Sequence, residues 1–169
     1  MWQTGMVAVL VLGMVAGGQT RPIREATLRD TAGKDVGRVV LRQVTGRIIV
    51  ELRVRGLPAG SHGYHLHEVG LCEGPSFESA GGHYNPGNKE HGRRTDRGPH
   101  LGDLGNITVN ENGAGDRSVT ITSAEAREGM ENFLGARGRA LVVHANEDDE
   151  RTDPHGNSGA RIACAAIMP

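Results

Sequence analysis

A chain of 169 residues is long enough for one domain with its own core, because a domain of about 150 residues buries roughly 70% of the surface that its unfolded chain exposes. A formal net charge of −1 gives no electrostatic reason to expect nucleic acid as a partner. Aromatic residues make up only 3% of the chain, so the core must consist mainly of Val, Ile, Leu and Ala.

An apolar run from Met6 to Ala16 stands near the N-terminus and is followed by Gly17, Gly18 and Gln19. The run is too short to cross a bilayer of about 30 Å, but it matches the hydrophobic part of a secretory signal. We predict a leader over residues 1–20, a domain over residues 21–169, and export to the periplasm or the medium without a stable membrane anchor. The alternative is a short uncleaved tail or a wrongly chosen start codon, because the positive charge usual at the start of a signal is missing.

Alternation of apolar and polar residues predicts short strands along most of the remaining chain. The clearest is 47–55, where Ile48, Val50, Leu52 and Val54 form one face. The other predicted strands cover residues 26–30, 36–44, 64–68, 107–109, 119–122, 140–145 and 161–167.

A turn at residues 110–115 predicts that the strands on either side of it form a hairpin. Residues 123–133 are polar and favour a short helical turn at most. With no helical periodicity of useful length, the chain is predicted to be all-β, an eight-stranded antiparallel sandwich or flattened barrel. Two long loops, one after residue 68 and one over residues 146–158, interrupt the strands.

The first of these loops belongs to a stretch of about forty residues, from His65 to Asp103, that holds five of the eight histidines. Gly81-Gly82, residues 85–88 and Gly98-Pro99 between them are typical of loops. So long a loop in a compact domain needs something to fix it, and imidazole nitrogens with a carboxylate oxygen can bind a divalent metal. We therefore expect the loop to fold around metal.

Three imidazoles and one carboxylate in this loop form a set typical of structural zinc sites: His83, His91, His100 and Asp103. His100 and Asp103 are only three residues apart, close enough to bind one ion from a tight turn. The alternative is a group of surface histidines in a polar loop, which does not explain their concentration in this stretch.

Two further histidines stand just before the loop on a predicted strand. In His65-Leu66-His67 both imidazoles lie on one face of the strand, and Leu66 points to the other face. His144 lies on another predicted strand, from which its ring can join the same site across the sheet. A His-x-His pair alone is weak evidence, and the loop histidines are what favour a metal site.

The two cysteines, Cys72 and Cys164, leave two interpretations. In an exported protein an even number suggests one disulfide, whereas in the cytosol two free thiols are expected. A bridge would close more than half of the chain into a loop and stabilise the fold by roughly 4–5 kcal/mol at most in the chain-entropy treatment. It would also tie the metal loop to the last strand.

Five segments together are similar to copper/zinc superoxide dismutases over about residues 26–167, and they resemble bacterial members most. They are residues 63–70 (Gly-Tyr-His-Leu-His-Glu-Val-Gly), 79–86 (Ser-Ala-Gly-Gly-His-Tyr-Asn-Pro), 98–104 (Gly-Pro-His-Leu-Gly-Asp-Leu), 142–144 (Val-Val-His) and 156–164 (Gly-Asn-Ser-Gly-Ala-Arg-Ile-Ala-Cys). The resemblance implies a Greek-key barrel and an oxidoreductase that converts superoxide, a small anion, to dioxygen and hydrogen peroxide. Its cofactors would be copper and zinc.

The resemblance also implies roles for individual residues. The copper ligands would be His65, His67, His83 and His144. The zinc ligands would be His83, His91, His100 and Asp103, so that His83 bridges the two metals and supplies a proton during turnover. Cys72 and Cys164 match the internal disulfide of the family.

Further residues stand outside this set. Asp148 matches a carboxylate that hydrogen-bonds one copper and one zinc histidine, with neighbouring Asp149 as the alternative. Arg161 matches an active-site arginine that attracts and orients the anion. His155 falls at the rim of the second loop without an assigned role, and His62 is predicted to be a surface residue.

Two other function classes compete with the enzyme. One is a non-enzymatic copper or zinc carrier or buffer on the same fold, for which a missing copper ligand or arginine would be expected; none is missing. The other is a zinc-stabilised interaction module, which leaves His65, His67 and His144 unexplained. The sequence leaves open whether the chain forms a homodimer.

Overall fold

The computed structural model describes residues 22–169, so the predicted leader lies outside the described residues. The described chain has eight strands: β1 (Pro22–Asp30), β2 (Asp35–Val44), β3 (Arg47–Arg55), β4 (Gly60–His67), β5 (Asp103–Val109), β6 (Ala114–Ile121), β7 (Arg139–His144) and β8 (Arg161–Ile167). Three short helices complete it: the 3-10 helix η1 (Glu78–Ala80), α1 (Ala124–Glu128) and α2 (Met130–Leu134). The predicted all-β class is confirmed.

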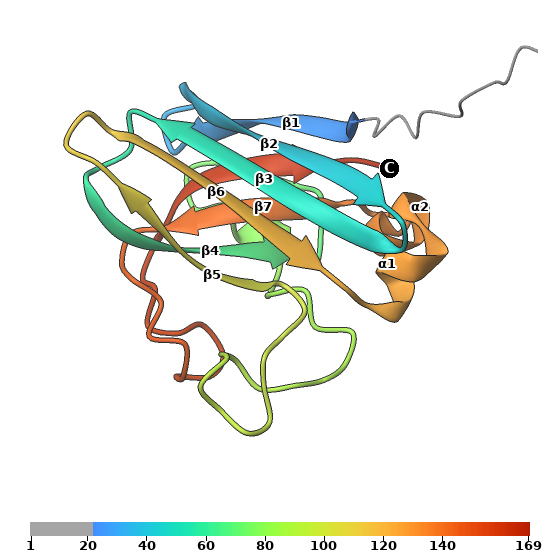
Figure 1. Cartoon of the computed structure of the whole chain (residues 1–169). Helices are drawn as coiled ribbons and strands as arrows, with labels where there is room; N and C mark the ends of the chain where they lie inside the picture. The colour runs from blue at the N-terminus through green and yellow to red at the C-terminus, as the bar shows by residue number, and fades with distance from the viewer. Residues whose placement is uncertain (1–21) are drawn as a thin grey trace, which may run out of the picture.

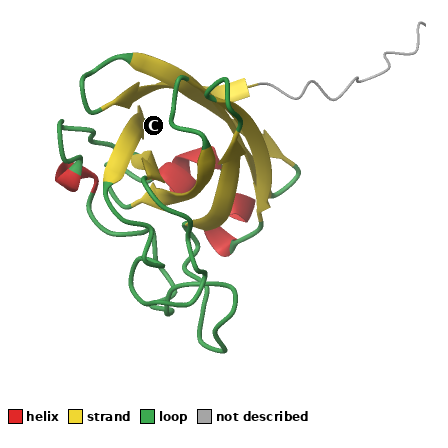
Figure 2. Cartoon of the chain, turned by 90° about the vertical axis from the view of Figure 1, so that its left-hand side faces the viewer, coloured by secondary structure: helices red, strands yellow, loops and turns green. Residues whose placement is uncertain are grey.

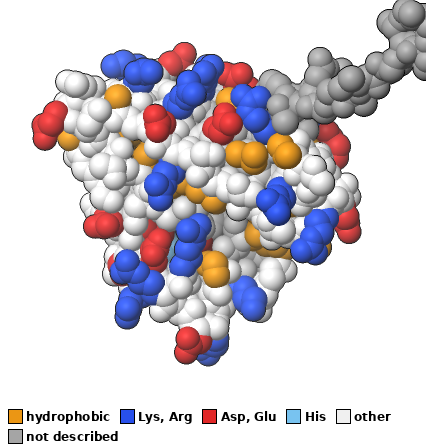
Figure 3. Space-filling model, viewed as in Figure 1, with side chains coloured by type: hydrophobic (Ala, Val, Ile, Leu, Met, Phe, Trp, Pro, Cys, Tyr) orange, Lys and Arg blue, Asp and Glu red, His pale blue; other side chains and the backbone are white. Residues whose placement is uncertain are grey.

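The strands form a single antiparallel sheet in the order β5-β4-β7-β8-β1-β2-β3-β6, which curls into a nearly closed barrel (Figures 1 and 2). The helices α1 and α2 lie at one end of the barrel, and the two long loops extend together from one side of it (Figure 1). On the face shown in Figure 3, basic and acidic side chains are interspersed and hydrophobic ones form only small groups.

The predicted hairpin over residues 107–122 is wrong in its pairing, although the turn is where it was expected. Asn110 closes that turn by accepting hydrogen bonds from the backbone of Asn112 and Ala114. Beyond the turn, β5 pairs with β4 and β6 pairs with β3, so these two consecutive strands form the two edges of the sheet. Local alternation and a turn cannot distinguish a hairpin from two strands that separate to opposite edges.

The core fills the barrel with aliphatic side chains, as the scarcity of aromatic residues predicted. On β3, Ile48, Val50, Leu52 and Val54 are all at most 1% exposed. Leu66 of β4 is fully buried in the same core, so the two histidines beside it point away from the barrel interior. The alternation of side chains along β4 therefore places Leu66 on the core face and His65 and His67 on the opposite face, where the site lies.

The short helices begin and end at residues suited to the purpose. Ser123 caps α1 through its hydroxyl, which accepts a hydrogen bond from the backbone of Ala126. Gly129, with φ of 126°, ends α1 and begins α2. Phe133 and Leu134 of α2 are fully buried and close that end of the core.

A disulfide joins Cys72 to Cys164, as the resemblance implied. It connects the first long loop to the middle of β8, across a sequence separation of 92 residues. Because β8 pairs with β7, the bridge holds the loop against the same part of the sheet that carries His144. The crosslink thus positions the loop relative to the site.

Candidate metal centre

The structure brings together all seven residues that the sequence assigned to metal. His65 and His67 come from β4, His144 from the end of β7 and Asp103 from the start of β5, and the other three come from the first long loop. They form two groups whose ligand atoms lie within 4.8 Å of one another. The first group is His65, His67, His83 and His144, and the second is His83, His91, His100 and Asp103. All seven are buried.

In the first group, each of three histidines has one ring nitrogen facing an oxygen that can only accept a hydrogen bond. His65 Nε2 lies 2.7 Å from Asp148 Oδ2, His67 Nδ1 lies 2.9 Å from the Gly81 carbonyl, and His144 Nδ1 lies 3.1 Å from the Gly159 carbonyl. Each of these nitrogens must therefore carry the proton of a neutral imidazole. The second nitrogen of each ring is left with a bare lone pair.

Those second nitrogens are His65 Nδ1, His67 Nε2 and His144 Nε2, and all three are buried without a hydrogen-bond partner. His83 Nε2, in the same group, is also buried and unpartnered. A buried polar atom without a partner costs roughly 1–3 kcal/mol, so four in one place need a common explanation. Converging imidazole lone pairs fit a transition-metal cation.

The second group converges on one carboxylate oxygen. The Nδ1 atoms of His83, His91 and His100 lie 2.9, 3.1 and 3.2 Å from Asp103 Oδ1. His91 Nε2 is 2.9 Å from Asp148 Oδ1, so in the neutral ring that nitrogen holds the proton and Nδ1 directs its lone pair at a carboxylate. A proton or a metal cation on Nδ1 makes that contact favourable, and three imidazoles with one carboxylate suit zinc.

His83 belongs to both groups because its two nitrogens face opposite ways. Nδ1 faces Asp103, and Nε2 faces the first group, where the His83 ring stacks on that of His65 at a centroid distance of 3.9 Å. Backbone pairing between His67 and His83 fixes this arrangement, since it holds the loop directly beside the end of β4. One imidazole thus separates the two groups of ligand atoms.

Asp148, rather than Asp149, lies between the two groups. Its two oxygens accept from His65 and His91, one histidine of each group, and the side chain is buried. Asp149 faces away and accepts from Thr152 and Asn157 within its own exposed loop. A carboxylate placed like Asp148 fixes the orientation and the proton position of both rings.

Two residues that the sequence did not single out hold Asp148 in place. The side chain of Asn106 accepts from the backbone N–H of Asp148 at 2.8 Å and donates to its carbonyl at 2.9 Å. Gly156, with φ of +61°, packs so tightly that any side chain would collide with Asp148 Oδ1 and His91 Nε2. Sequence pattern could not have found the hold of Asn106 on Asp148 or the contact of Gly156 with His91, because both join segments far apart in the chain.

Arg161, the first residue of β8, lies beside the first group. Its guanidinium donates to the carbonyls of Phe77 and Gly81 at 2.7 and 2.8 Å, and its side chain is 12% exposed. Two hydrogen bonds of this kind hold the planar group in one orientation at the edge of the site.

The two remaining histidines differ from one another in environment. His155 is exposed, and its ring centroid lies 5.3 Å from that of His83, over the outer side of the site. The prediction that His62 is a surface residue is wrong. His62 is 3% exposed, and its ring nitrogens each lie 2.9 Å from a carbonyl, those of His144 and Pro58. Pairing of β4 with two neighbouring strands, invisible in the sequence, buries it.

Burial has opposite outcomes for the pKa of different site histidines. It lowers the pKa of His65 to about 3 and that of His144 to about 4, because neither ring has enough compensating charge nearby. Burial acts in the same direction on His91, but hydrogen bonds to Asp103 and Asp148 outweigh it and raise the pKa of that ring to about 9. Hydrogen bonds from His83 and His91 hold the pKa of the Asp103 carboxyl below its usual range, and those from His65 and His91 do the same for Asp148, against the effect of burial.

Without metal, the protein is expected to lose stability on acidification from pH 7.5 to pH 5. The unfolded chain binds protons at His65 and His144 below about pH 6.5 and the folded chain does not, so each ring costs roughly 2 kcal/mol at pH 5. His91 offsets part of this, since its contribution is full below about pH 6.5 and disappears as the pH rises through 9. Thermal melts of chelator-treated protein measure the sum, and an equal or higher melting temperature at pH 5 would contradict it.

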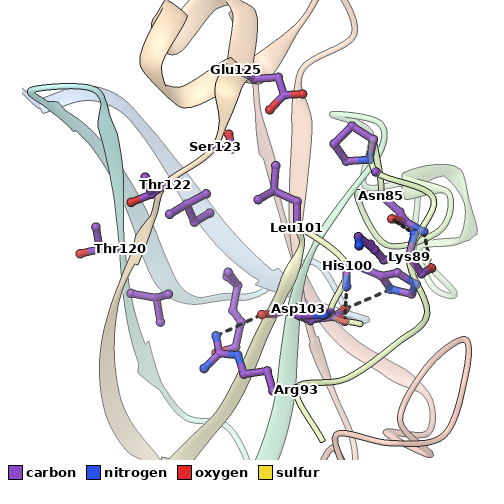
Figure 4. Close-up of a pocket in the computed structure, with 16 residues that line it drawn as sticks. Asn85, Lys89, Arg93, His100, Leu101, Asp103, Thr120, Thr122, Ser123 and Glu125 are labelled. Atoms are coloured by element: carbon purple, nitrogen blue, oxygen red, sulfur yellow. Dashed lines mark hydrogen bonds and ion pairs between the residues drawn. The ribbon is translucent and has the colours of Figure 1, made fainter. Parts of the chain in front are cut away.

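A cavity of about 420 Å³ lies behind the second group rather than over the unpartnered nitrogens. It opens between the first long loop and the end of β6 near α1 (Figure 4). His100 and Asp103 form part of its wall, and Arg93 closes another side by donating to the Asp103 and Leu104 carbonyls. None of the residues that line this cavity belongs to the first group.

Comparison with known proteins agrees with this geometry. A family model described as copper/zinc superoxide dismutase matches residues 36–167. Superoxide dismutase [Cu-Zn] 2 of Aquifex aeolicus is 38% identical over 144 residues, covering 84% of each chain. The extracellular superoxide dismutase [Cu-Zn] of Onchocerca volvulus is 39% identical over 166 residues, covering 92% of this chain and 79% of that one.

Among solved structures, that of a SOD-like protein from Bacillus subtilis superposes with a TM-score of 0.77 at 36% identity, covering 85% of this chain and 97% of that one. Within residues 22–169 no helix has the length and apolarity needed to cross a membrane. Since the family model spans most of the chain and relatives share more than a third of its residues along most of their length, the chain belongs to the copper/zinc superoxide dismutase family.

Proposed function

We propose that the chain dismutates superoxide, converting two superoxide anions and two protons to dioxygen and hydrogen peroxide. Four converging nitrogens without partners beside a fixed guanidinium carry this proposal. In it, copper is held by His65, His67, His83 and His144, and zinc by His83, His91, His100 and Asp103. When bound, copper would supply one-electron redox chemistry and zinc a fixed positive charge.

The chain's own residues have separable tasks in this mechanism. Asp148 and the carbonyls of Gly81 and Gly159 hold the protons of three ligand rings on their outer nitrogens, so that the inner nitrogens stay free. His83 Nε2 is the buried atom placed to carry a proton to the reduced oxygen, and solvent supplies the second proton. Arg161 attracts the anion and orients it beside the first group.

The carrier function is the weaker alternative, because storage of metal does not require a guanidinium fixed by two carbonyls at the mouth of the site. Decay of superoxide after pulse radiolysis distinguishes the two. We expect superoxide to decay far faster with protein reconstituted with copper and zinc than with an equal concentration of metal-free protein. Decay at the background rate, with both metals bound, would favour the carrier.

We further propose that residues 1–20 are a leader and that the domain of residues 21–169 acts outside the cytosol, in the periplasm or the medium. The disulfide supports this, since such bonds persist mainly in oxidising compartments, and one of the similar relatives is an extracellular enzyme. A homodimer stays a prediction. The exposed side chains of Leu71 and Met168, 47% and 52% exposed, are its candidate contact.

A further inference from the structure

The guanidinium of Arg161 has one carboxylate neighbour among the ion pairs of the described residues. Glu78 Oε2 lies 3.7 Å from its Nη2 atom, the same atom that donates to the Gly81 carbonyl. The arginine side chain is 12% exposed, whereas that of the glutamate is 75% exposed. The carboxylate therefore approaches from the solvent side, the side from which an anion must enter.

The position of Glu78 is set by the same segment that holds the arginine. Glu78 begins η1, which stands between Phe77 and Gly81, the two residues whose carbonyls accept from Arg161. Hydrogen bonds from the backbone N–H groups of Ala80 and Gly81 to the Phe77 and Glu78 carbonyls close this turn. The carboxylate thus starts from a fixed backbone although its end is free to move.

We propose that Glu78 sets the anion selectivity of the Arg161 site, an inference that rests on the proposed function. Its carboxylate lowers the local positive potential and must be outcompeted by any entering anion. Coulomb repulsion grows with the charge of that anion, so a doubly charged anion is rejected more strongly than a singly charged one. The site thereby keeps access for superoxide while hydrogenphosphate is held off.

The test compares the affinities of Glu78→Gln and of the unaltered protein for two anions, azide and inorganic phosphate. Azide is titrated into protein loaded with copper and zinc and followed by the absorption of copper(II). Inorganic phosphate is titrated into zinc-loaded, copper-free protein by calorimetry at physiological ionic strength. We expect azide to bind roughly two- to fivefold more tightly in the variant, and phosphate to gain more than azide, from the loss of one charge at this distance.

Glu111→Gln is the matched control, because it removes the same charge from the turn between β5 and β6. That turn follows the end of β5 opposite to Asp103. At the rise of a strand, Glu111 lies about 25 Å from Asp103, a distance more than twice the Debye length at physiological salt. We expect it to leave both affinities unchanged. In protein that carries Arg161→Ala, Glu78→Gln is expected to have a smaller effect, since the carboxylate no longer competes with the anion for the guanidinium.

Three results would overturn the inference: equal anion affinities in Glu78→Gln and unaltered protein, equal gains in Glu111→Gln, or a gain that is undiminished without Arg161. Melting temperatures check that the exposed variant is folded, and little change is expected because the pair is open to solvent. Superoxide decay in the unaltered protein tests the proposed function separately. If superoxide decays at the background rate while the anion affinities are as expected, the proposed function is refuted and the inference about Glu78 is not.

Discussion

Replacing His67 by alanine is expected to abolish superoxide dismutation while zinc stays bound. The change removes one of four nitrogens from the first group and touches none of the atoms that converge on Asp103 Oδ1. A site with one ligand fewer should hold copper weakly, and activity should fall by at least about 100-fold, more than for loss of a residue that only orients a ligand. Pulse radiolysis measures the activity, and elemental analysis after dialysis measures both metals.

His155→Ala is the matched control for this variant. It also removes an imidazole near His83, but one that belongs to neither group of ligand atoms. We expect it to retain both metals. Loss of zinc together with copper in His67→Ala, or loss of copper in His155→Ala, would show that the division into two sites is wrong.

Zinc is expected to raise the melting temperature of the metal-free protein by about 8–16 °C when its free concentration is about a thousandfold above its dissociation constant. At that ratio binding contributes about 4 kcal/mol. The physical reason is the cluster at Asp103, where three imidazoles converge on one carboxylate oxygen, a donor set that suits zinc. The same ion fixes the long loop that supplies three of the ligands. Scanning calorimetry with and without zinc measures the shift.

His91→Ala should lose most of that gain, because the variant removes one ligand and one partner of Asp148 at once. His67→Ala should keep it, since its ring lies in the other group. A gain in His91→Ala equal to that of the unaltered protein would show that zinc stabilises the chain elsewhere.

The sequence predicted what depends on local pattern and on chemistry within one segment. Period-two alternation located β3, and an apolar run located β8, at the bounds that the structure has, and the set of histidines with Asp103 contained the seven residues that converge. Strand pairing could not be predicted from the sequence, because two strands joined by a turn have the same local pattern whether they pair or separate. In the structure, β5 and β6 separate. The same limit hid the burial of His62 and the hold of Asn106 on Asp148, which depend on contacts between distant segments.

One carbonyl oxygen, that of Gly81, accepts hydrogen bonds from both His67 Nδ1 and Arg161 Nη2, at 2.9 and 2.8 Å. A single main-chain atom therefore fixes the orientation of both the His67 ring and the Arg161 guanidinium. The entrance cannot be redesigned independently of the first group of ligands, because a displacement of the Gly81 carbonyl would reorient both side chains. Evolution of this segment is accordingly restricted to changes that leave the peptide between residues 81 and 82 where it is.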